Sequence, residues 1–159
     1  MLKSWGWLSL LVIVLDQAAK YLAEALLVMH RPIPVLPSFN LMLTYNTGAA
    51  FSFLADAGGW QRWFFLSLGL MVSIGLVAWL YRLKPEEKRL AAALALILGG
   101  AIGNLIDRAW LGQVIDFIQL YYDHWYWPAF NIADSAITLG ATLLVLDSFW
   151  SREASPRLN

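Results

Sequence analysis

The chain lacks cysteine and has little histidine, and these absences exclude several kinds of active site. No cysteine occurs among its 159 residues, which rules out thiol catalysis, structural disulfides and cysteine-ligated metals. The two histidines, His30 and His124, lie far apart in segments typical of loops, which argues against a histidine metal site or a Ser-His-Asp triad. Any catalysis must therefore use Asp, Glu, Lys or Ser, and no metal or other cofactor is expected.

The chain also has no net charge and few charged residues. Lysine plus arginine equal aspartate plus glutamate, 11 against 11, so no basic surface for nucleic acid is expected. Charged residues make up only 14%, whereas hydrophobic residues make up 60% and the mean hydropathy is +0.59. Soluble domains contain roughly 45–50% apolar residues, so this composition indicates an integral membrane protein.

Four apolar segments are long enough to form helices that cross a hydrocarbon core about 30 Å thick. They cover residues 5–27, 63–81, 90–106 and 132–150. With no internal repeat or linker between them, residues 1–159 are expected to form a single membrane-embedded domain. The predicted fold class is therefore all-α, with four transmembrane helices.

Positive charges are distributed unevenly between the two ends of these segments. Seven lie on one side, namely Lys3, Arg82, Lys84, Lys88, Arg89, Arg152 and Arg157, against Arg31, Arg62 and Arg108 on the other. The positive-inside rule then places both termini and the 82–89 loop in the cytoplasm. All nine tryptophans lie at or just outside the predicted span ends, as aromatic belts at the two interfaces require.

The segments predicted to lie outside the cytoplasm contain more than simple loops. Residues 39–45 and 114–119 are rich in strand-forming side chains and bounded by Pro, Asn or Gly, which predicts a small β element. Residues 121–130 are rich in aromatics and are expected to lie on the outer leaflet as a short interfacial helix. A buried aromatic cluster between helices is an equally good interpretation of part of that segment.

Two glycines and a polar cluster mark the end of the third span. Gly99 and Gly103 form a small-xxx-small face suited to close helix packing. Asn104, Asp107 and Arg108 then share one helix face, and such a cluster usually faces the protein interior or a water-filled pocket. An ion pair between Asp107 and a nearby arginine that ends the helix explains the cluster equally well.

Polar residues from three predicted spans reach the same depth. At about 1.5 Å per residue, Asp16, Asn104 and Asp134 lie roughly 20, 22 and 27 Å from the cytoplasmic ends of their helices. In a core about 30 Å thick, all three fall in the outer leaflet. An outward-facing polar site is therefore predicted, formed by Asp16, Lys20, Asn104, Asp107, Arg108 and Asp134, with Asp116 able to fold back onto it.

Two carboxylates in a partly dry site are chemically useful. Held close together, they cannot both ionise cheaply, so one keeps a proton while the other stays charged. The charged carboxylate can accept a proton from water as the water attacks an amide carbonyl, and the protonated one can hydrogen-bond the carbonyl oxygen. Asp116 and Asp134 are candidates for this pair, and the shared proton belongs to the pair rather than to either residue.

These residues form an ordered set of blocks that resembles the lipoprotein signal peptidases, also called signal peptidase II. The blocks are Asp16 with Lys20, then residues 46–51, 100–117 and 130–134. The resemblance implies an aspartyl peptidase of the bacterial inner membrane that cuts diacylglyceryl-modified prolipoproteins just before the lipidated cysteine. Its partners would be lipidated prolipoprotein signal peptides and membrane lipids. Independently of the resemblance, the chain is expected to be a monomer, although the sequence does not specify the oligomeric state. The family's external β-cradle would correspond to the two predicted strands.

The resemblance also implies roles for individual residues. Asp116 and Asp134 match the catalytic pair, and six further residues match the surrounding polar positions: Asp16, Lys20, Asn46, Asn104, Arg108 and Asn131. Gly48, next to two small residues, would let a substrate backbone approach closely, although a tight turn explains it as well. Asp107 belongs to the predicted site because of its depth and its helix face.

Three other functions are compatible with parts of the pattern. Intramembrane acids often serve a transporter or proton relay, but here they cluster at one depth instead of forming a path across the membrane. A Ser–Lys peptidase could use Lys20 with Ser52 or Ser135. A non-catalytic four-span scaffold would not need the ordered polar blocks.

Overall fold

The computed structural model describes residues 1–48 and 58–153 and contains the four predicted spans. The helices are α1 (Leu2–Leu26), α2 (Trp60–Arg82), α3 (Lys88–Trp110) and α4 (Ile132–Glu153). Each contains a stretch of at least 18 residues that is apolar enough to cross a membrane. The prediction of a multi-pass membrane protein with four spanning helices is thereby confirmed.

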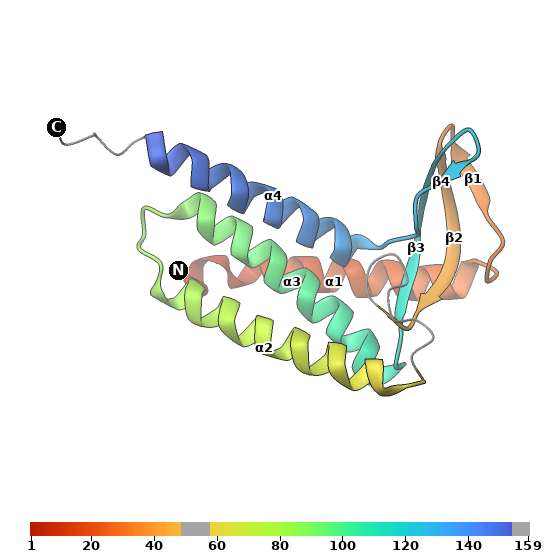
Figure 1. The fold of residues 1–159 in the computed structure, drawn as a ribbon, viewed down its shortest axis with the longest axis horizontal. Coiled ribbons are helices and arrows are strands. Elements are labelled where there is room, and N and C mark those ends of the chain that lie inside the picture. Colours follow the sequence, from red (N-terminus) through yellow and green to blue (C-terminus); the bar gives the residue numbers. More distant parts are fainter. Residues whose placement is uncertain (49–57, 154–159) are drawn as a thin grey trace.

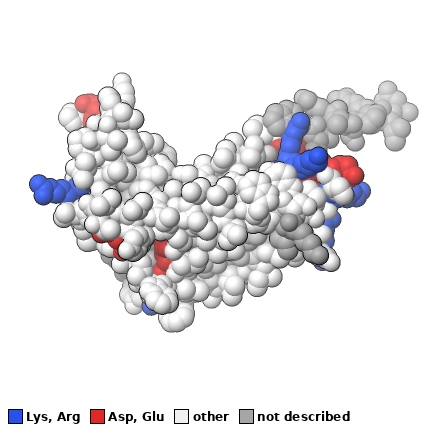
Figure 2. Space-filling model, turned by 180° about the vertical axis from the view of Figure 1, so that it is seen from behind, with Lys and Arg blue, Asp and Glu red and all other residues white. Residues whose placement is uncertain are grey.

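The helices form a bundle with a small sheet at one end. The N-terminus, the α2–α3 turn and the far end of α4 all lie at the opposite end (Figure 1). In the view of Figure 2, charged side chains lie toward the two ends and the middle of the bundle is uncharged. An uncharged belt of this kind is what a lipid-facing surface requires, because charged side chains are costly in hydrocarbon.

Glycines allow α3 to pack closely against its neighbours. A Cβ added at Gly99 would lie 2.8 Å from the Ser9 backbone oxygen of α1, and one at Gly103 would lie 2.6 Å from Asp16 Oδ2. The predicted small-xxx-small face is therefore confirmed, and it packs against α1. A further glycine, Gly100, makes the closest approach to α4.

The sheet is antiparallel, in the order β1-β2-β3-β4. Its strands are β1 (Ile33–Leu36), β2 (Phe39–Asn46), β3 (Val114–Tyr122) and β4 (Trp125–Tyr126). The two predicted strands correspond to β2 and β3, which pair so that Thr44 lies opposite Asp116. Strand β1 was not predicted; it is an edge strand in a proline-rich stretch, where proline is tolerated because no partner needs its missing N–H.

The predicted short interfacial helix does not form at residues 121–130. Residues 114–126 instead make a β-hairpin that turns at Asp123, which adopts a positive φ of 52°. Its aromatic rings are not buried between helices either, since Trp125 is 83% and Tyr122 79% exposed. Aromatic residues on either side of a turn-forming Asp form strands readily, and this preference outweighs the aromatic content that suggested an interfacial helix.

The face of β3 that packs on α1 determines where Asp116 points. Ile115 and Phe117 join a buried cluster with Ala23 of α1 and Leu43 of β2. Because side chains alternate along a strand, Asp116 lies on the opposite face, away from this apolar cluster.

Candidate active site

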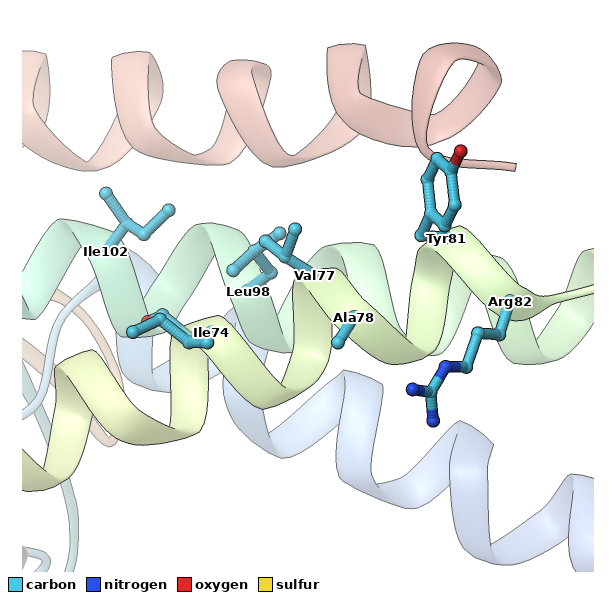
Figure 3. A pocket seen from close by; sticks show the side chains of 8 residues that line it. Ile74, Val77, Ala78, Tyr81, Arg82, Leu98 and Ile102 are labelled. Atoms are coloured by element: carbon cyan, nitrogen blue, oxygen red, sulfur yellow. The ribbon is translucent and has the colours of Figure 1, made fainter.

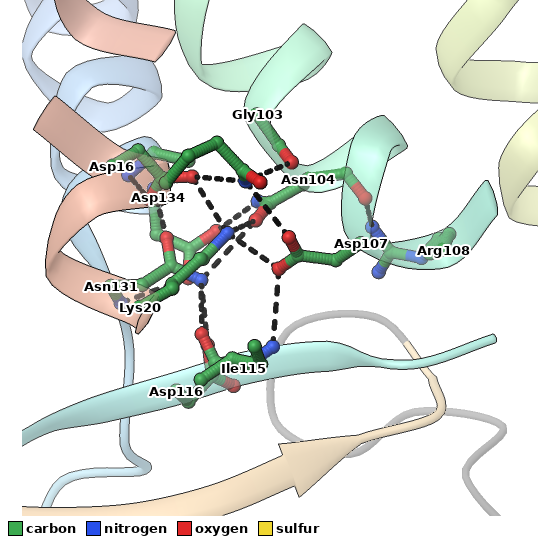
Figure 4. Close-up of polar contacts among 12 residues, drawn as sticks. Asp16, Lys20, Gly103, Asn104, Asp107, Arg108, Ile115, Asp116, Asn131 and Asp134 are labelled. Atoms are coloured by element: carbon green, nitrogen blue, oxygen red, sulfur yellow. Dashed lines mark hydrogen bonds and ion pairs between the residues drawn. The ribbon is translucent and has the colours of Figure 1, made fainter. Parts of the chain in front are cut away.

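A groove of about 1270 Å³ opens where the sheet meets the helix bundle. Five of the predicted site residues line it, namely Asn46, Asn104, Arg108, Asp116 and Asp134. The other five, Asp16, Lys20, Gly48, Asp107 and Asn131, are buried behind its wall. Figure 4 shows how side chains from α1, α3, β3 and α4 converge there. The structure thus brings together residues that are separated by more than a hundred positions in the chain.

Asp134 is held at the start of α4 by reciprocal capping. Asn131 Oδ1 accepts a 2.9 Å hydrogen bond from the Asp134 backbone N–H, and Asp134 Oδ2 accepts one of 3.3 Å from the Asn131 backbone N–H. This is the capping-box arrangement, with Asn at the N-cap and an acid three residues later. The cap fixes the Asp134 carboxylate in the first turn of α4, where the helix dipole favours negative charge.

Asp116 is a buried carboxyl group with an altered affinity for protons. Its side chain is 3% exposed and its Oδ1 accepts a 2.7 Å hydrogen bond from Asn131 Nδ2. Burial, followed by the negative charge of Asp134, raises the pKa of Asp116 to about 7, although hydrogen bonds from Asn46 and Asn131 and the charge of Lys20 oppose the rise. Asp116 therefore exchanges a proton close to neutral pH, as a general acid or base must.

Two asparagines connect the two carboxylates. Asn104 Nδ2 donates to Asp134 Oδ1 over 2.8 Å, and Asn104 Oδ1 accepts from Asn131 Nδ2 over 3.2 Å. Asn131 is completely buried and also contacts Asp116, so a continuous chain of amide groups runs from one acid to the other. Such a network holds both carboxylates in place at the wall of the groove.

Arg108 links the groove to the end of β2. Its Nη2 donates to the Gly48 backbone oxygen over 2.8 Å, and its guanidinium lies 5.3 Å from the ring centroid of Phe65. The Gly48 N–H donates in turn to Asn46 Oδ1 over 2.9 Å, which closes a tight turn. Within the described residues, the buried Nε of Arg108 has no hydrogen-bond partner. Asn46 therefore lines the groove, and Gly48 lies behind it in contact with Arg108.

A buried ion-pair network lies behind the groove. Lys20 Nζ lies 2.8 Å from Asp16 Oδ2 and 2.7 Å from Asp107 Oδ2. Asp107 therefore pairs with the lysine of α1, so its alternative interpretation as a partner of a nearby arginine is wrong. Gln17, which was not among the predicted site residues, donates to Asp107 Oδ1 over 2.9 Å. The sequence feature that could have identified Gln17 is its spacing: it is a polar side chain three positions before Lys20, on the same helix face.

This network speaks against a Ser–Lys mechanism with Ser135. Lys20 is 1% exposed, and its nitrogen is occupied by Asp16 and Asp107 rather than by a serine hydroxyl. The Ser135 hydroxyl donates to the Asn131 backbone oxygen over 2.9 Å. Ser52, the other candidate nucleophile, lies outside the described residues. Among the residues that the structure does describe, no group of three or more His, Cys, Asp and Glu is arranged to hold a metal ion.

A second hollow, of about 540 Å³, lies between α2 and α3 and has a different character. It is lined mainly by apolar side chains such as Ile74, Val77 and Leu98, with Tyr81 and Arg82 toward one end (Figure 3). None of the predicted site residues lines it. The candidate chemistry is thus confined to the groove beside the sheet.

Comparison with known proteins identifies chains similar to this one over nearly its whole length. The family model described as "Signal peptidase (SPase) II" matches residues 8–150. The lipoprotein signal peptidase of Pseudomonas fluorescens (strain Pf0-1) is 59% identical over 152 residues, which cover 94% of this chain and 89% of the relative. That of Acinetobacter baumannii (strain ATCC 17978) is 56% identical over 153 residues, which cover 96% and 87%.

Two solved structures titled as a bacterial membrane enzyme share the fold. One has a TM-score of 0.88 at 27% identity, and the match covers 100% of this chain and 95% of the chain in that structure. The other has a TM-score of 0.78 at 29% identity and covers 92% and 93%. The similarity therefore extends to the sheet as well as to the four helices.

Proposed function

This chain belongs to the signal peptidase II family, and we propose that it removes signal peptides from diacylglyceryl-modified prolipoproteins by an aspartyl mechanism. The cut would fall just before the lipidated cysteine, with Asp116 and Asp134 as the catalytic pair. One observation carries the mechanism: a single buried asparagine, Asn131, contacts both carboxylates at the wall of the groove. The relatives' names support the substrate class.

The reaction follows from a pair of carboxyl groups that share one proton. The ionised carboxylate accepts a proton from water as the water oxygen bonds to the scissile carbonyl carbon. The protonated carboxyl group donates a hydrogen bond to the carbonyl oxygen and stabilises the negative charge that develops there. When the carbon–nitrogen bond breaks, the proton taken from water passes to the leaving amine, which is the new N-terminus of the lipidated cysteine. The pair then returns to its starting protonation.

The shape of the groove suits a substrate that is anchored in lipid. From Asp134 the groove continues along α4 past Leu139 and Thr142, inside a membrane-spanning segment. In the other direction it reaches the hairpin rings of Tyr122 and Trp125. A peptide attached to a diacylglyceryl group can therefore enter sideways from the bilayer and place its polar backbone beside the acids. Because one chain supplies the whole described groove, we propose that the monomer is the active unit.

The direct test is cleavage of a defined substrate by the purified protein. A synthetic prolipoprotein segment with a diacylglyceryl cysteine should yield two products, and mass spectrometry should place the cut before that cysteine. The same peptide with an unmodified cysteine is the substrate control, and Asp116→Asn is the protein control. The proposal is overturned if the wild type leaves the lipidated peptide intact, or if well-folded Asp116→Asn cleaves it at the wild-type rate. Activity of Asp116→Asn with loss in Ser135→Ala would favour the serine mechanism.

We further propose that the protein lies in the bacterial inner membrane with both termini in the cytoplasm and the sheet outside. The N-terminus and the Arg82–Lys88 turn lie at one end of the bundle and the sheet at the other (Figure 1). The excess of Lys and Arg at the first end supports this orientation. In this cysteine-free chain, His124→Cys at the 94%-exposed hairpin tip should react with an impermeant thiol reagent in spheroplasts, whereas Lys84→Cys should not. The reverse pattern would invert the topology.

A further inference from the structure

Lys20 is a buried lysine close to the two candidate catalytic acids. It is 1% exposed, and its ammonium lies within hydrogen-bond distance of Asp16 Oδ2 (2.8 Å), Asp107 Oδ2 (2.7 Å) and Asn104 Oδ1 (3.0 Å). A lysine ammonium has three N–H groups and accepts nothing, so these oxygens use its full capacity. Figure 4 shows Lys20 at the centre of this convergence.

The two carboxylates that Lys20 binds each hold a backbone group beside a catalytic acid. Asp16 Oδ1 accepts a 2.8 Å hydrogen bond from the N–H of Ala133, which directly precedes Asp134. Asp107 Oδ2 accepts one of 3.2 Å from the N–H of Ile115, which directly precedes Asp116. One ammonium therefore ties the start of α4 to the start of β3, the two elements that carry the acids.

The third contact determines how an amide is oriented. Asn104 Oδ1 accepts from Lys20 and from Asn131 Nδ2, which leaves Asn104 Nδ2 to donate to Asp134 Oδ1 over 2.8 Å. Because Lys20 can only donate, the opposite orientation of the Asn104 side chain would place two donors against each other. Lys20 thereby keeps a hydrogen-bond donor directed at Asp134.

We propose that Lys20 is a positioning residue for the aspartyl reaction, acting through Asp16, Asp107 and Asn104 to set the separation and orientation of the Asp116–Asp134 pair. This inference rests on the proposed function and extends it. An ordinary helix–helix ion pair would need one carboxylate partner and no link to either acid. Here Asp16 and Asp107 each accept a hydrogen bond from a backbone N–H next to one of the acids. The third partner, Asn104, donates directly to Asp134.

The test replaces the ammonium by an uncharged side chain of similar length. Lys20→Met should lower kcat about 100-fold, the scale expected for small displacements of reacting groups, while KM for the lipidated peptide changes less than about threefold. The charged groups around the pair are Asp16 and Lys20 on α1 and Asp107 and Arg108 on α3. Removing one positive charge from this set should also move the pH–rate profile toward higher pH.

A matched control on the same pair of helices distinguishes a loss of stability from a loss of positioning of the acids. Ser9 Oγ donates to the Ala95 backbone oxygen over 2.8 Å, another buried contact between α1 and α3, but far from the groove. Ser9→Ala should lower the melting temperature and leave kcat and the pH profile unchanged. If Lys20→Met behaves in the same way as Ser9→Ala, Lys20 is only a structural ion pair and the inference is overturned.

A second variant covers the possibility that Lys20→Met does not fold, because that change leaves two buried carboxylates without their counter-ion. In the wild type, Lys20, Asp16 and Asp107 together have a formal charge of −1. The double variant Lys20→Met with Asp107→Asn has the same formal charge, which Asp16 alone then carries. This double variant should fold and still show the low kcat, whereas a wild-type kcat would overturn the inference. Failure of the proposed function is a different result, in which the wild type itself does not cleave the lipidated peptide.

Discussion

Asn131 donates a 2.7 Å hydrogen bond from its side-chain amide to Oδ1 of Asp116. The same side chain caps α4 through its oxygen, which accepts from the backbone N–H of Asp134 over 2.9 Å. One completely buried residue thus performs two separable tasks: its nitrogen holds one acid, and its oxygen holds the helix turn that carries the other. Substitutions can remove the first task without the second.

Asn131→Ser should separate activity from stability. Both Asn131→Ser and Asn131→Ala leave the buried acceptors of the Asn131 amide unpaired, so both should melt below the wild type, but serine is as good an N-cap as asparagine and should retain about 1 kcal/mol that alanine loses. Both variants lose the donor to Asp116, so both should lower kcat at least tenfold, which corresponds to about 1.4 kcal/mol of transition-state stabilisation. Thermal melts and peptide cleavage on the same samples check this. Wild-type turnover in Asn131→Ser would show that the contact with Asp116 does not matter.

The raised pKa of Asp116 makes two properties depend on pH. With a folded-state pKa of about 7 and an ordinary value of 3.8, only the folded protein holds this proton between about pH 4 and 7. The free energy of unfolding should therefore fall as pH rises through that window. Above about pH 7 the ionisation of Asp116 should change it no further. Cleavage should decline above about pH 7, because the proton that Asp116 holds in the folded protein is then lost.

Infrared spectroscopy can follow that proton directly. The protonated-carboxyl band that Asp116→Asn removes should disappear in the wild type as pH rises through about 7. In Asp134→Asn the like charge is absent, so the Asp116 pKa should fall and the band should disappear at lower pH. An unchanged titration in Asp134→Asn would mean that the two acids do not interact.

The sequence predicted that polar residues of three helices meet at one level of the bundle, because helical rise is nearly constant. Counting residues from the charged ends placed Asp16, Asn104 and Asp134 in one layer, and the structure joins them through Lys20 and Ala133. The β2 and β3 strands were predictable for a related reason, since runs of strand-forming side chains bounded by turn residues have few alternatives.

Other contacts depend on which helix face meets which neighbour, and a single sequence does not specify that. Asp107 had an arginine next to it in sequence but pairs with Lys20 from another helix. Gln17 entered the network only because close packing at Gly103 brings α1 against α3. The hairpin at 121–126 was misjudged because aromatic side chains suit an interfacial helix and a strand equally well.

Close packing at Gly100 should be essential for the position of α4. A Cβ there would lie 2.3 Å from the backbone oxygen of Ala133, so Gly100→Ala must push α3 and α4 apart. We expect a loss of about 1–3 kcal/mol in stability, as in other overpacked interiors, together with reduced cleavage because Ala133 adjoins Asp134. Gly75→Ala is the matched control, since a Cβ there meets nothing within 4 Å and alanine favours a helix. Equal melting temperatures for the two variants would contradict this account of the α3–α4 contact.

The two acids should behave as one catalytic unit. Asp116→Asn and Asp134→Asn keep the side-chain shape but remove proton exchange, and each should lower kcat by about 10²–10⁴-fold. If the pair acts jointly, the double variant should be scarcely slower than either single variant, because the first change already abolishes the shared function. All three proteins should fold, since an uncharged amide relieves the repulsion between two buried carboxylates. Rates from single-turnover cleavage of the lipidated peptide, each corrected for folded protein, would measure the coupling. Multiplicative effects of the two substitutions would assign the acids independent roles and remove the basis for a shared proton.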